Sequence, residues 1–305
     1  MKMGRFSFVI PVFRGSENNI NQLISLIALL NLSWYEIIFV FDDGKQESLD
    51  ALKAITNKKT KAIILAKNFG QHNAIICGIE HAQGDWIITM DEDLQHDPLE
   101  MPKLLAKQKE EDFDLVYGKY HELSHSKFRN ITSIALKKLL KLGIPNLHPD
   151  FTSYRLIRAS VAKKMIEMNN SYTFLDGYLS WVTASVTSVE ITHSESKAGS
   201  SSYSVKKLIE HSINIFVTFS NLPIRILSIS ALIFILFSFS YTIFIIISSL
   251  TILNYEAGFP TFIAFLGFGF GLMLFGLGVV GEYIARINYK TTKRPNYHIK
   301  EILEK

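Results

Sequence analysis

The stretch Asp85-Trp86-Ile87-Ile88-Thr89-Met90-Asp91-Glu92-Asp93-Leu94-Gln95-His96 joins an apolar run to a cluster of oxygen-bearing side chains. The apolar run predicts a buried strand. Residues two apart on an extended backbone project to the same side, so Asp91, Asp93 and Gln95 can offer oxygens to one hard cation such as Mg²⁺ or Mn²⁺, with Glu92 pointing away. Such an ion can hold a diphosphate. The alternative is a solvated acidic turn that caps the next helix.

Three similar apolar runs lie upstream, at Phe6–Val12, Glu36–Phe41 and Ala62–Leu65, each separated from the next by a helical stretch. Near-continuous apolar strands suit a parallel sheet that is covered on both faces, and the alternation with helices is typical of doubly wound α/β proteins. The sequence therefore predicts a Rossmann-like α/β fold with a mostly parallel sheet, in which ligands bind beyond the carboxyl ends of the strands.

Polar side chains follow these strands at their predicted carboxyl ends. They are Pro11, Phe13 and Glu17 after the first strand, Asp42 and Asp43 after the second, and Asp91 to Gln95 after the fourth. We expect them to line one crevice. Asp42 and Asp43 can accept hydrogen bonds from a base or from ribose hydroxyls, although Asp-Asp-Gly is also an ordinary turn. Residues 68–73 precede an apolar helix, and their amides can face an anion or simply form a loop and cap.

The apolar residues are concentrated near the C-terminus. Residues 226–253 and 260–281 carry no charged side chain, and roughly 20 such residues are enough to cross a bilayer. We expect a transmembrane hairpin over residues 223–285. The alternative is a pair of buried core helices, which a domain of this size could hardly sheathe.

The charges around this hairpin predict its orientation. The segment between the two apolar stretches has no Lys or Arg, whereas residues 286–305 hold six Lys or Arg against two Glu, a net charge of +4. By the positive-inside rule, this basic tail and the N-terminal domain belong in the cytoplasm, on the inner face of the cytoplasmic membrane. No signal peptide is recognisable at Met1. The whole-chain charge of +4 gives no reason to expect nucleic acid, and the single cysteine, Cys77, excludes an intrachain disulfide.

Residues 205–222 mix apolar side chains with Lys, Glu, His and Asn. This pattern is typical of an amphipathic helix that lies in the membrane interface. A helix packed on the N-terminal domain would show the same pattern. The sequence leaves both interpretations open.

Four motifs in order resemble the family-2 glycosyltransferases with the GT-A fold. They are Val9-Ile10-Pro11-Val12, Asp42-Asp43-Gly44, Asn68-Phe69-Gly70-Gln71-His72-Asn73-Ala74 and Met90-Asp91-Glu92-Asp93-Leu94-Gln95-His96. The chain is most similar to the polyprenyl-phosphate glycosyltransferases, which include dolichol-phosphate mannose synthase and the bacterial undecaprenyl-phosphate sugar transferases. The resemblance places a GT-A domain at residues 1–204 and implies inverting transfer from a nucleotide sugar, UDP being favoured over GDP, to polyprenyl phosphate.

The resemblance also implies roles for individual residues. It assigns nucleotide binding to Pro11, Phe13, Glu17, Asp42, Asp43 and Asp91, the Mg²⁺ or Mn²⁺ site to Asp91, Asp93 and Gln95, catalysis to Asp93, Asp150 and Arg155, and the acceptor phosphate to Arg155, Lys197, Ser202 and Lys206. A structural ion pair or helix cap is the alternative for Asp150 and Arg155. The family commonly has an Arg where this chain has Ser196, and the neighbouring Lys197 offers a point charge rather than a bidentate fork.

Two other functions stay open at this point. A glycosyltransferase with a hydroxyl acceptor would need a general base, for which Asp150 is the candidate. A membrane-anchored scaffold with a decayed nucleotide site is opposed by the intact Asp91, Asp93 and Gln95. Glycines between residues 267 and 278 can support either homo-oligomer formation or packing within the hairpin. The transferred sugar is not predictable from these residues.

Overall fold

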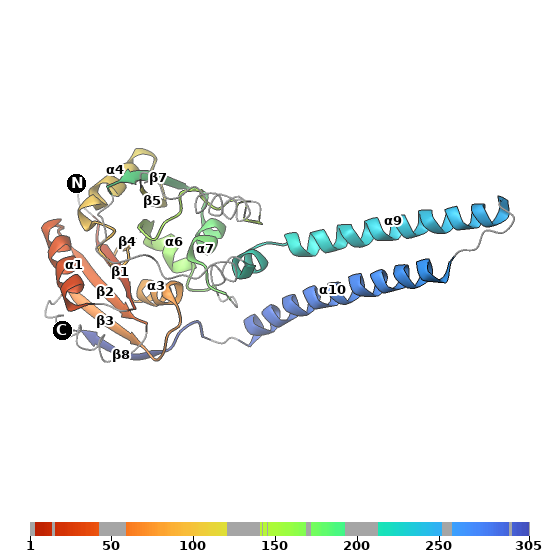
Figure 1. Ribbon diagram of the computed structural model, residues 1–305. Helices are drawn as coiled ribbons and strands as arrows, with labels where there is room; N and C mark the ends of the chain where they lie inside the picture. Colours follow the sequence, from red (N-terminus) through yellow and green to blue (C-terminus); the bar gives the residue numbers. More distant parts are fainter. Residues whose placement is uncertain are drawn as a thin grey trace.

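A computed structural model describes residues 4–13, 16–42, 59–120, 141, 143–144, 146–168, 172–192, 213–251, 258–292 and 295–304. These residues form an α/β domain built around a mixed sheet and, beyond it, a pair of long helices (Figure 1).

The sheet of the described residues has the strand order β7-β5-β6-β4-β1-β2-β3-β8. Its strands are β1 (Phe6–Val12), β2 (Tyr35–Phe41), β3 (Thr60–Leu65), β4 (Trp86–Thr89), β5 (Leu115–Tyr120), β6 (Arg155–Arg158), β7 (Val186–Ile191) and β8 (Ile299–Glu304). The β4-β1-β2-β3 block is parallel, and so is the pair β5–β7, whereas β6 runs antiparallel to β4 and β5, and β8 runs antiparallel to β3. The predicted α/β fold with a largely parallel centre is confirmed.

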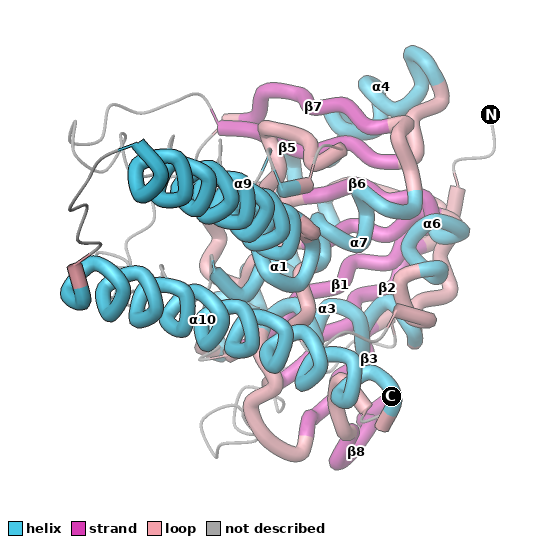
Figure 2. The backbone as a smooth tube through the Cα atoms, turned by 90° about the vertical axis from the view of Figure 1, so that its right-hand side faces the viewer, coloured by secondary structure: helices cyan, strands magenta, loops and turns pink. Residues whose placement is uncertain are grey.

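Helices cover both faces of this sheet (Figure 2). They are α1 (Glu17–Leu29), α3 (Gln71–Glu80), the 3₁₀ helix η1 (Pro98–Glu100), α4 (Met101–Glu111), α6 (Ala159–Lys164) and α7 (Leu175–Val182). Side chains that alternate along β1 enter two different cores: Val9 packs with α3, α6 and α7, and Ile10 packs with α1 and α4. Burial on both faces explains why these strands are apolar at nearly every position.

The helices α9 (Leu222–Thr251) and α10 (Phe259–Thr291) leave the domain side by side. Each is long and apolar enough to cross a membrane, and the most apolar part of each is 0% buried by the rest of the protein. The alternative of two buried core helices is therefore wrong. Gly269 and Gly276 face α9, whereas added methyl groups at Gly267, Gly271 and Gly278 would meet no atom within 4 Å.

Residues 213–219 form the last described helical turns before α9, and they pack on the α/β domain. Ile215 and Phe219 are buried in the same core as α7. This contact supports the second interpretation of the 205–222 segment for its C-terminal part, while residues 205–212 lie outside the described part of the chain.

After α10, the chain returns to the domain and ends in β8, which adds a strand beside β3. The sequence predicts only a basic tail here. The strand is short and its residues are mostly exposed, so its sequence lacks the regular alternation of apolar and charged side chains that predicts a strand.

Candidate active site

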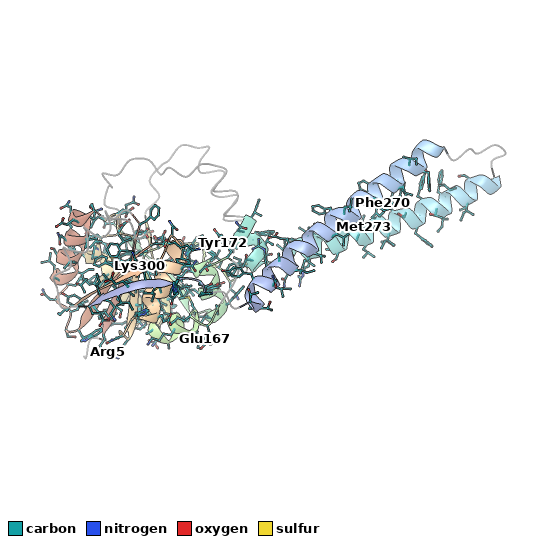
Figure 3. The ribbon with its side chains drawn as sticks, turned by 90° about the horizontal axis from the view of Figure 1, so that it is seen from below. Arg5, Glu167, Tyr172, Phe270, Met273 and Lys300 are labelled. Atoms are coloured by element: carbon teal, nitrogen blue, oxygen red, sulfur yellow. The ribbon has the colours of Figure 1, made fainter. Side chains whose placement is uncertain are left out.

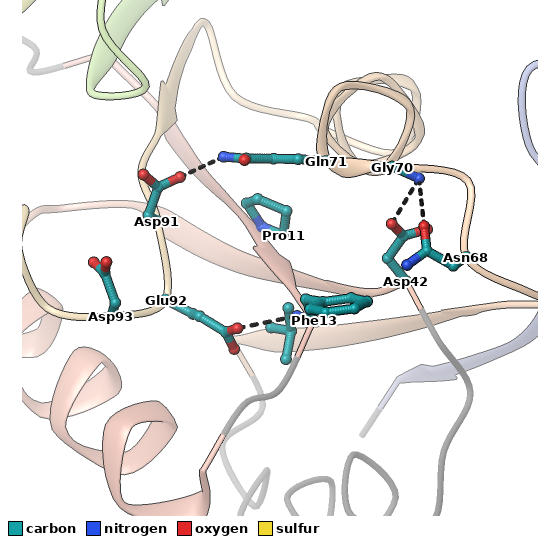
Figure 4. A pocket seen from close by; sticks show the side chains of 10 residues that line it. Pro11, Phe13, Asp42, Asn68, Gly70, Gln71, Asp91, Glu92 and Asp93 are labelled. Atoms are coloured by element: carbon teal, nitrogen blue, oxygen red, sulfur yellow. Dashed lines mark hydrogen bonds between the residues drawn. The ribbon is translucent and has the colours of Figure 1, made fainter. Parts of the chain in front are cut away.

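A pocket of about 350 Å³ opens beyond the carboxyl ends of β1, β2 and β4 (Figure 4). It is lined by Pro11, Val12, Phe13, Asp42, Asn68, Gly70, Gln71, Asp91, Glu92 and Asp93. Five of the predicted site residues are therefore brought together, although they come from three separate strand ends. This is the position that parallel α/β sheets provide for a ligand.

Asp42 lies at the end of β2, and its buried carboxylate holds the loop that leads into α3. Its oxygens accept hydrogen bonds from the backbone N–H groups of Phe69 (2.7 Å) and Gly70 (2.8 Å). Gly70 has a φ of 90°, a conformation that favours glycine. Asp42 also lines the pocket, so the same carboxylate that holds this loop stands at the candidate ligand site.

Asp91 is oriented by side chains from three segments. Gln71 Nε2 donates to its Oδ1 (2.5 Å) and Ser153 Oγ donates to its Oδ2 (2.6 Å). The backbone N–H of Asp91 donates to Nδ1 of His96 (3.2 Å), which is buried against the ring of Tyr154. The carboxylate is thus fixed in direction while it faces the pocket.

The residues after Asp91 form turns rather than a continued strand, and Leu94 among them has a φ of 62°. Asp93 Oδ1 accepts from the backbone N–H of Gln95 (3.1 Å), and Gln95 itself does not line the pocket. Glu92 does line it and accepts from the backbone N–H of Phe13 (3.0 Å). The extended-backbone argument for placing residues 91, 93 and 95 on one side is therefore wrong, although Asp91 and Asp93 share the pocket.

Asp150 lies outside the pocket lining, between β5 and β7. Its Oδ2 accepts from Ser188 Oγ (2.8 Å), and Lys119 Nζ lies 3.5 Å away. Burial raises the pKa of the Asp150 carboxyl, but the Ser188 hydrogen bond and the charge of Lys119 outweigh burial and hold the pKa below its usual value. A lowered pKa makes this carboxylate a weaker base.

Arg155 is 2% exposed and forms a bidentate pair with Asp176 of α7, with two N–O distances of 2.8 Å. Tyr117 also donates to Asp176 (2.9 Å). This arrangement is the structural ion pair that the sequence analysis held open as the alternative for Arg155. Arg155 also contacts the segment that orients Asp91, since its Nη1 donates to Thr89 Oγ1 and to the carbonyl of Ser153, both at 3.2 Å.

The remaining predicted residues are not brought into the pocket by the described structure. Glu17 is exposed in the first turn of α1 and does not line the pocket. Asp43, Lys197, Ser202 and Lys206 lie outside the described residues.

Asp91 and Asp93, two of the four carboxylates that line the pocket, suit a divalent cation that shares its ligands with a substrate. Among the described residues there is no group of three His, Cys, Asp or Glu that could enclose an ion. Mg²⁺ is usually held by one or two carboxylates, with substrate phosphates and waters supplying the other ligands. Asp91 and Asp93 match that pattern, and Gln71 and Ser153 fix the first of them.

Gln71, Glu92 and Ser153 are functional candidates that the sequence reasoning did not assign. The sequence of residues 68–73 predicts a loop before a helix, but it does not indicate a contact between Gln71 and Asp91. Ser153 is 62 residues from Asp91 in sequence, and only the β4–β6 pairing brings the two together.

Comparison with known proteins matches residues 7–166 to the family described as Glycosyl transferase family 2. The undecaprenyl-phosphate 4-deoxy-4-formamido-L-arabinose transferase of Shewanella sediminis is 33% identical, over 97% of this chain and 92% of that protein. The putative glycosyltransferase CsbB of Bacillus subtilis is 30% identical, over 99% and 93%. The prophage bactoprenol glucosyl transferase homolog of Escherichia coli K12 is 29% identical, over 98% and 99%.

Among solved structures, the glucosyl-3-phosphoglycerate synthase of Mycobacterium tuberculosis, crystallised with Mn²⁺ and UDP-glucose, has a similar fold. Its TM-score is 0.52 at 15% identity, and the match covers 70% of this chain and 77% of that one. At this identity the likeness concerns the fold alone.

Proposed function

Because this chain belongs to glycosyl transferase family 2, we propose that it moves a sugar from a nucleotide sugar to polyprenyl phosphate at the cytoplasmic face of a membrane. One observation carries the proposal. A single polypeptide joins a carboxylate-lined pocket to two helices that are long and apolar enough to cross a membrane. Relatives named for undecaprenyl phosphate and bactoprenol match it over nearly its whole length, these helices included.

The nucleotide sugar would occupy the pocket beyond β1, β2 and β4. Asp42 lines it, with a carboxylate that can accept from a base or a ribose hydroxyl, and Phe13 offers an exposed ring at its edge. Asp91 and Asp93 lie at the opposite side, where a diphosphate would sit. UDP is favoured over GDP by the resemblance to the bacterial branch.

Asp91 and Asp93 would hold Mg²⁺ or Mn²⁺ together with diphosphate oxygens. When bound, the ion offsets the negative charge that grows on the departing diphosphate. Gln71 and Ser153 keep the Asp91 carboxylate directed at this position, so the protein does not have to reorganise as that charge develops.

The acceptor phosphate needs no strong general base. A phosphomonoester has its second pKa at about 6, so its oxygen is already ionised near neutral pH. That oxygen would form a bond to the anomeric carbon while the bond from this carbon to the nucleoside diphosphate breaks and its electron pair leaves with the diphosphate. Attack opposite the leaving group inverts the anomeric configuration.

The position of Asp150 favours this acceptor over a hydroxyl. A hydroxyl acceptor would require a base, and Asp150 was the candidate. Its carboxylate is held by Ser188 and Lys119 outside the pocket lining, and its pKa is lowered. A polyprenyl chain, by contrast, requires a membrane-bound enzyme, since withdrawing it from the bilayer costs about 0.8 kcal/mol per CH₂.

The test is transfer from radiolabelled UDP- and GDP-sugars to undecaprenyl phosphate in detergent, with Mg²⁺ or Mn²⁺ and with EDTA. We expect a metal-dependent lipid product that Asp93→Asn abolishes. Asp85→Asn is the matched control, because Asp85 pairs with Arg5 at the other end of β4. Full activity in EDTA or in Asp93→Asn would contradict the metal assignment. Product only with hydroxyl acceptors would contradict the proposed acceptor.

A further inference from the structure

Trp181 is a large side chain on the catalytic domain that the proposed reaction does not use. It lies in the last turn of α7 and is 50% exposed. Its ring packs on Phe219, with the ring centroids 4.8 Å apart. A single exposed aromatic side chain is ordinary on a protein surface. A function for Trp181 can therefore be inferred only from where it lies in the molecule.

That place is the level at which both long helices leave the domain. Phe219 is three residues before the start of α9. On α10, Tyr283 donates its hydroxyl to the carbonyl of Ser220 (3.0 Å), and Arg286 donates to Thr218 Oγ1 (2.6 Å). Both helices are therefore tied together at residues 218–220, and Trp181 contacts the same short segment. Figure 1 shows α7 on the side of the domain from which α9 and α10 extend.

The surroundings at this level have the composition of a membrane boundary. The candidate membrane span of α9 begins at Leu222 and contains the charged residue Arg225 in its first turn. On α10, the charged residues Glu282 and Arg286 lie near the end that meets the domain. Tyr283 is an aromatic residue at the same height. Trp and Tyr concentrate at the headgroup level of bilayers, because their rings are apolar and carry one polar group.

We propose that Trp181 inserts into the lipid interface and gives the catalytic domain a membrane contact besides the two helices. The inference rests on the proposed membrane function. The bilayer is the partner of this surface, since the exposed ring of Trp181 is connected to the membrane-spanning helices through its contact with Phe219. The two helices leave the whole protein free to tilt in the bilayer, whereas a lipid contact beside them limits that tilt.

This contact bears on the active site through α7 itself. Asp176 of the same helix holds Arg155, which donates to the carbonyl of Ser153, and the Ser153 hydroxyl orients Asp91. A continuous set of hydrogen bonds therefore links the membrane-facing helix to the pocket. The lipid contact would set the height of the pocket above the headgroups, where the acceptor phosphate lies.

The three tryptophans of the chain allow a direct test. The full-length Trp34→Phe/Trp86→Phe variant keeps only Trp181, and it is reconstituted into phosphatidylcholine–phosphatidylglycerol vesicles with bromine near the headgroup end or deep in the acyl chain. We expect shallow bromine to reduce Trp181 fluorescence to roughly half and deep bromine to have less effect. The control keeps only Trp34, beside Arg5 at the far end of the domain (Figure 3), and should be unquenched.

A second probe separates this proposal from the membrane function. Phe237→Trp, in a chain with its three tryptophans changed to Phe, places one tryptophan on the exposed surface of α9. Deep bromine should quench it. Quenching of this probe without quenching of Trp181 overturns the inference and leaves the spans in place. Absence of quenching at both positions overturns the inference and the membrane assignment together.

Discussion

Asp91 is held so tightly that its orientation is set before a ligand arrives. The Ser153 hydroxyl and the Gln71 amide each engage one of its oxygens. A hydrogen bond to a charged group contributes about 1.5–3 kcal/mol. We expect Ser153→Ala to raise the metal concentration for half-maximal transfer by about ten-fold, because the carboxylate then samples other directions. Titration of activity with Mn²⁺ measures this.

Ser188→Ala is the matched control for that substitution. It removes the same kind of hydroxyl–carboxylate bond, but from Asp150 outside the pocket lining. Its metal dependence should equal that of the wild type. An equal shift in both variants would show that the effect does not run through Asp91.

Arg155 can be tested for its two assigned roles by comparing stability with acceptor binding. Arg155→Met leaves the buried carboxylate of Asp176 without its cation, which should cost about 3–5 kcal/mol of unfolding free energy. The double variant Arg155→Met/Asp176→Leu should regain most of the loss. Thermal unfolding in detergent gives both values. If Arg155 binds the acceptor phosphate instead, Arg155→Met would raise the KM for undecaprenyl phosphate with little change in stability.

The rate at which Cys77 is labelled measures how readily α3, the helix that carries Gln71, opens. The thiol is fully buried, and burial, helped by the charge of Glu80, raises its pKa from 9.0 to about 12. At pH 8 the reactive thiolate is then about 1000-fold scarcer than for the ordinary thiol. We expect maleimide to label native protein very slowly at pH 8 and denatured protein at once. Fast labelling of the native protein would show that α3 opens readily.

At the scale of elements, the first four strands could be predicted from sequence and the last four could not. The run Phe6–Val12 matches β1, because strands buried on both faces are apolar throughout. β6 begins and ends with Arg, and β7 is only partly buried, so neither has this signature. Their positions depend on pairing between distant segments. The residues of the site divide in the same way. Asp91 and Asp93 belong to a motif that can be recognised in the sequence, whereas Ser153 reaches Asp91 only through the pairing of β6.

The strand β8 can be tested by removing it. A chain that ends at His298 loses the partner of β3 and exposes the backbone of Ala62, Ile63 and Ile64 at an open edge. Open apolar edges pair with other chains, so we expect a lower Tm and larger particles in size-exclusion chromatography. The control Ile302→Thr/Leu303→Thr keeps the strand and should stay close to the wild type. Equal damage in both would assign the effect to the side chains rather than to the pairing.

At the scale of the whole molecule, the catalytic domain is attached to both long helices. Residues 213–219 pack on α7 before α9 begins, and β8 joins the sheet after α10 ends. Two attachments on one domain restrict its motion more than a single linker would. The described structure therefore places the pocket and the spans in one mechanical unit, which suits an enzyme whose acceptor stays in the bilayer.

The orientation of this unit in the membrane is the last prediction. Residues 252–258, between the two long helices, contain no Lys or Arg, whereas the chain after α10 is basic, so the hairpin tip should lie outside and the catalytic domain inside. Two single-cysteine chains in a Cys77→Ala background test this in right-side-out membrane vesicles. Gly258→Cys, at the exposed start of α10, should react with an impermeant maleimide in sealed vesicles. Lys300→Cys, exposed on β8, should react only after permeabilisation. The cysteine-free chain gives the background. Labelling of Lys300→Cys in sealed vesicles would put the pocket on the side without nucleotide sugars and would contradict the proposed reaction at the cytoplasmic face.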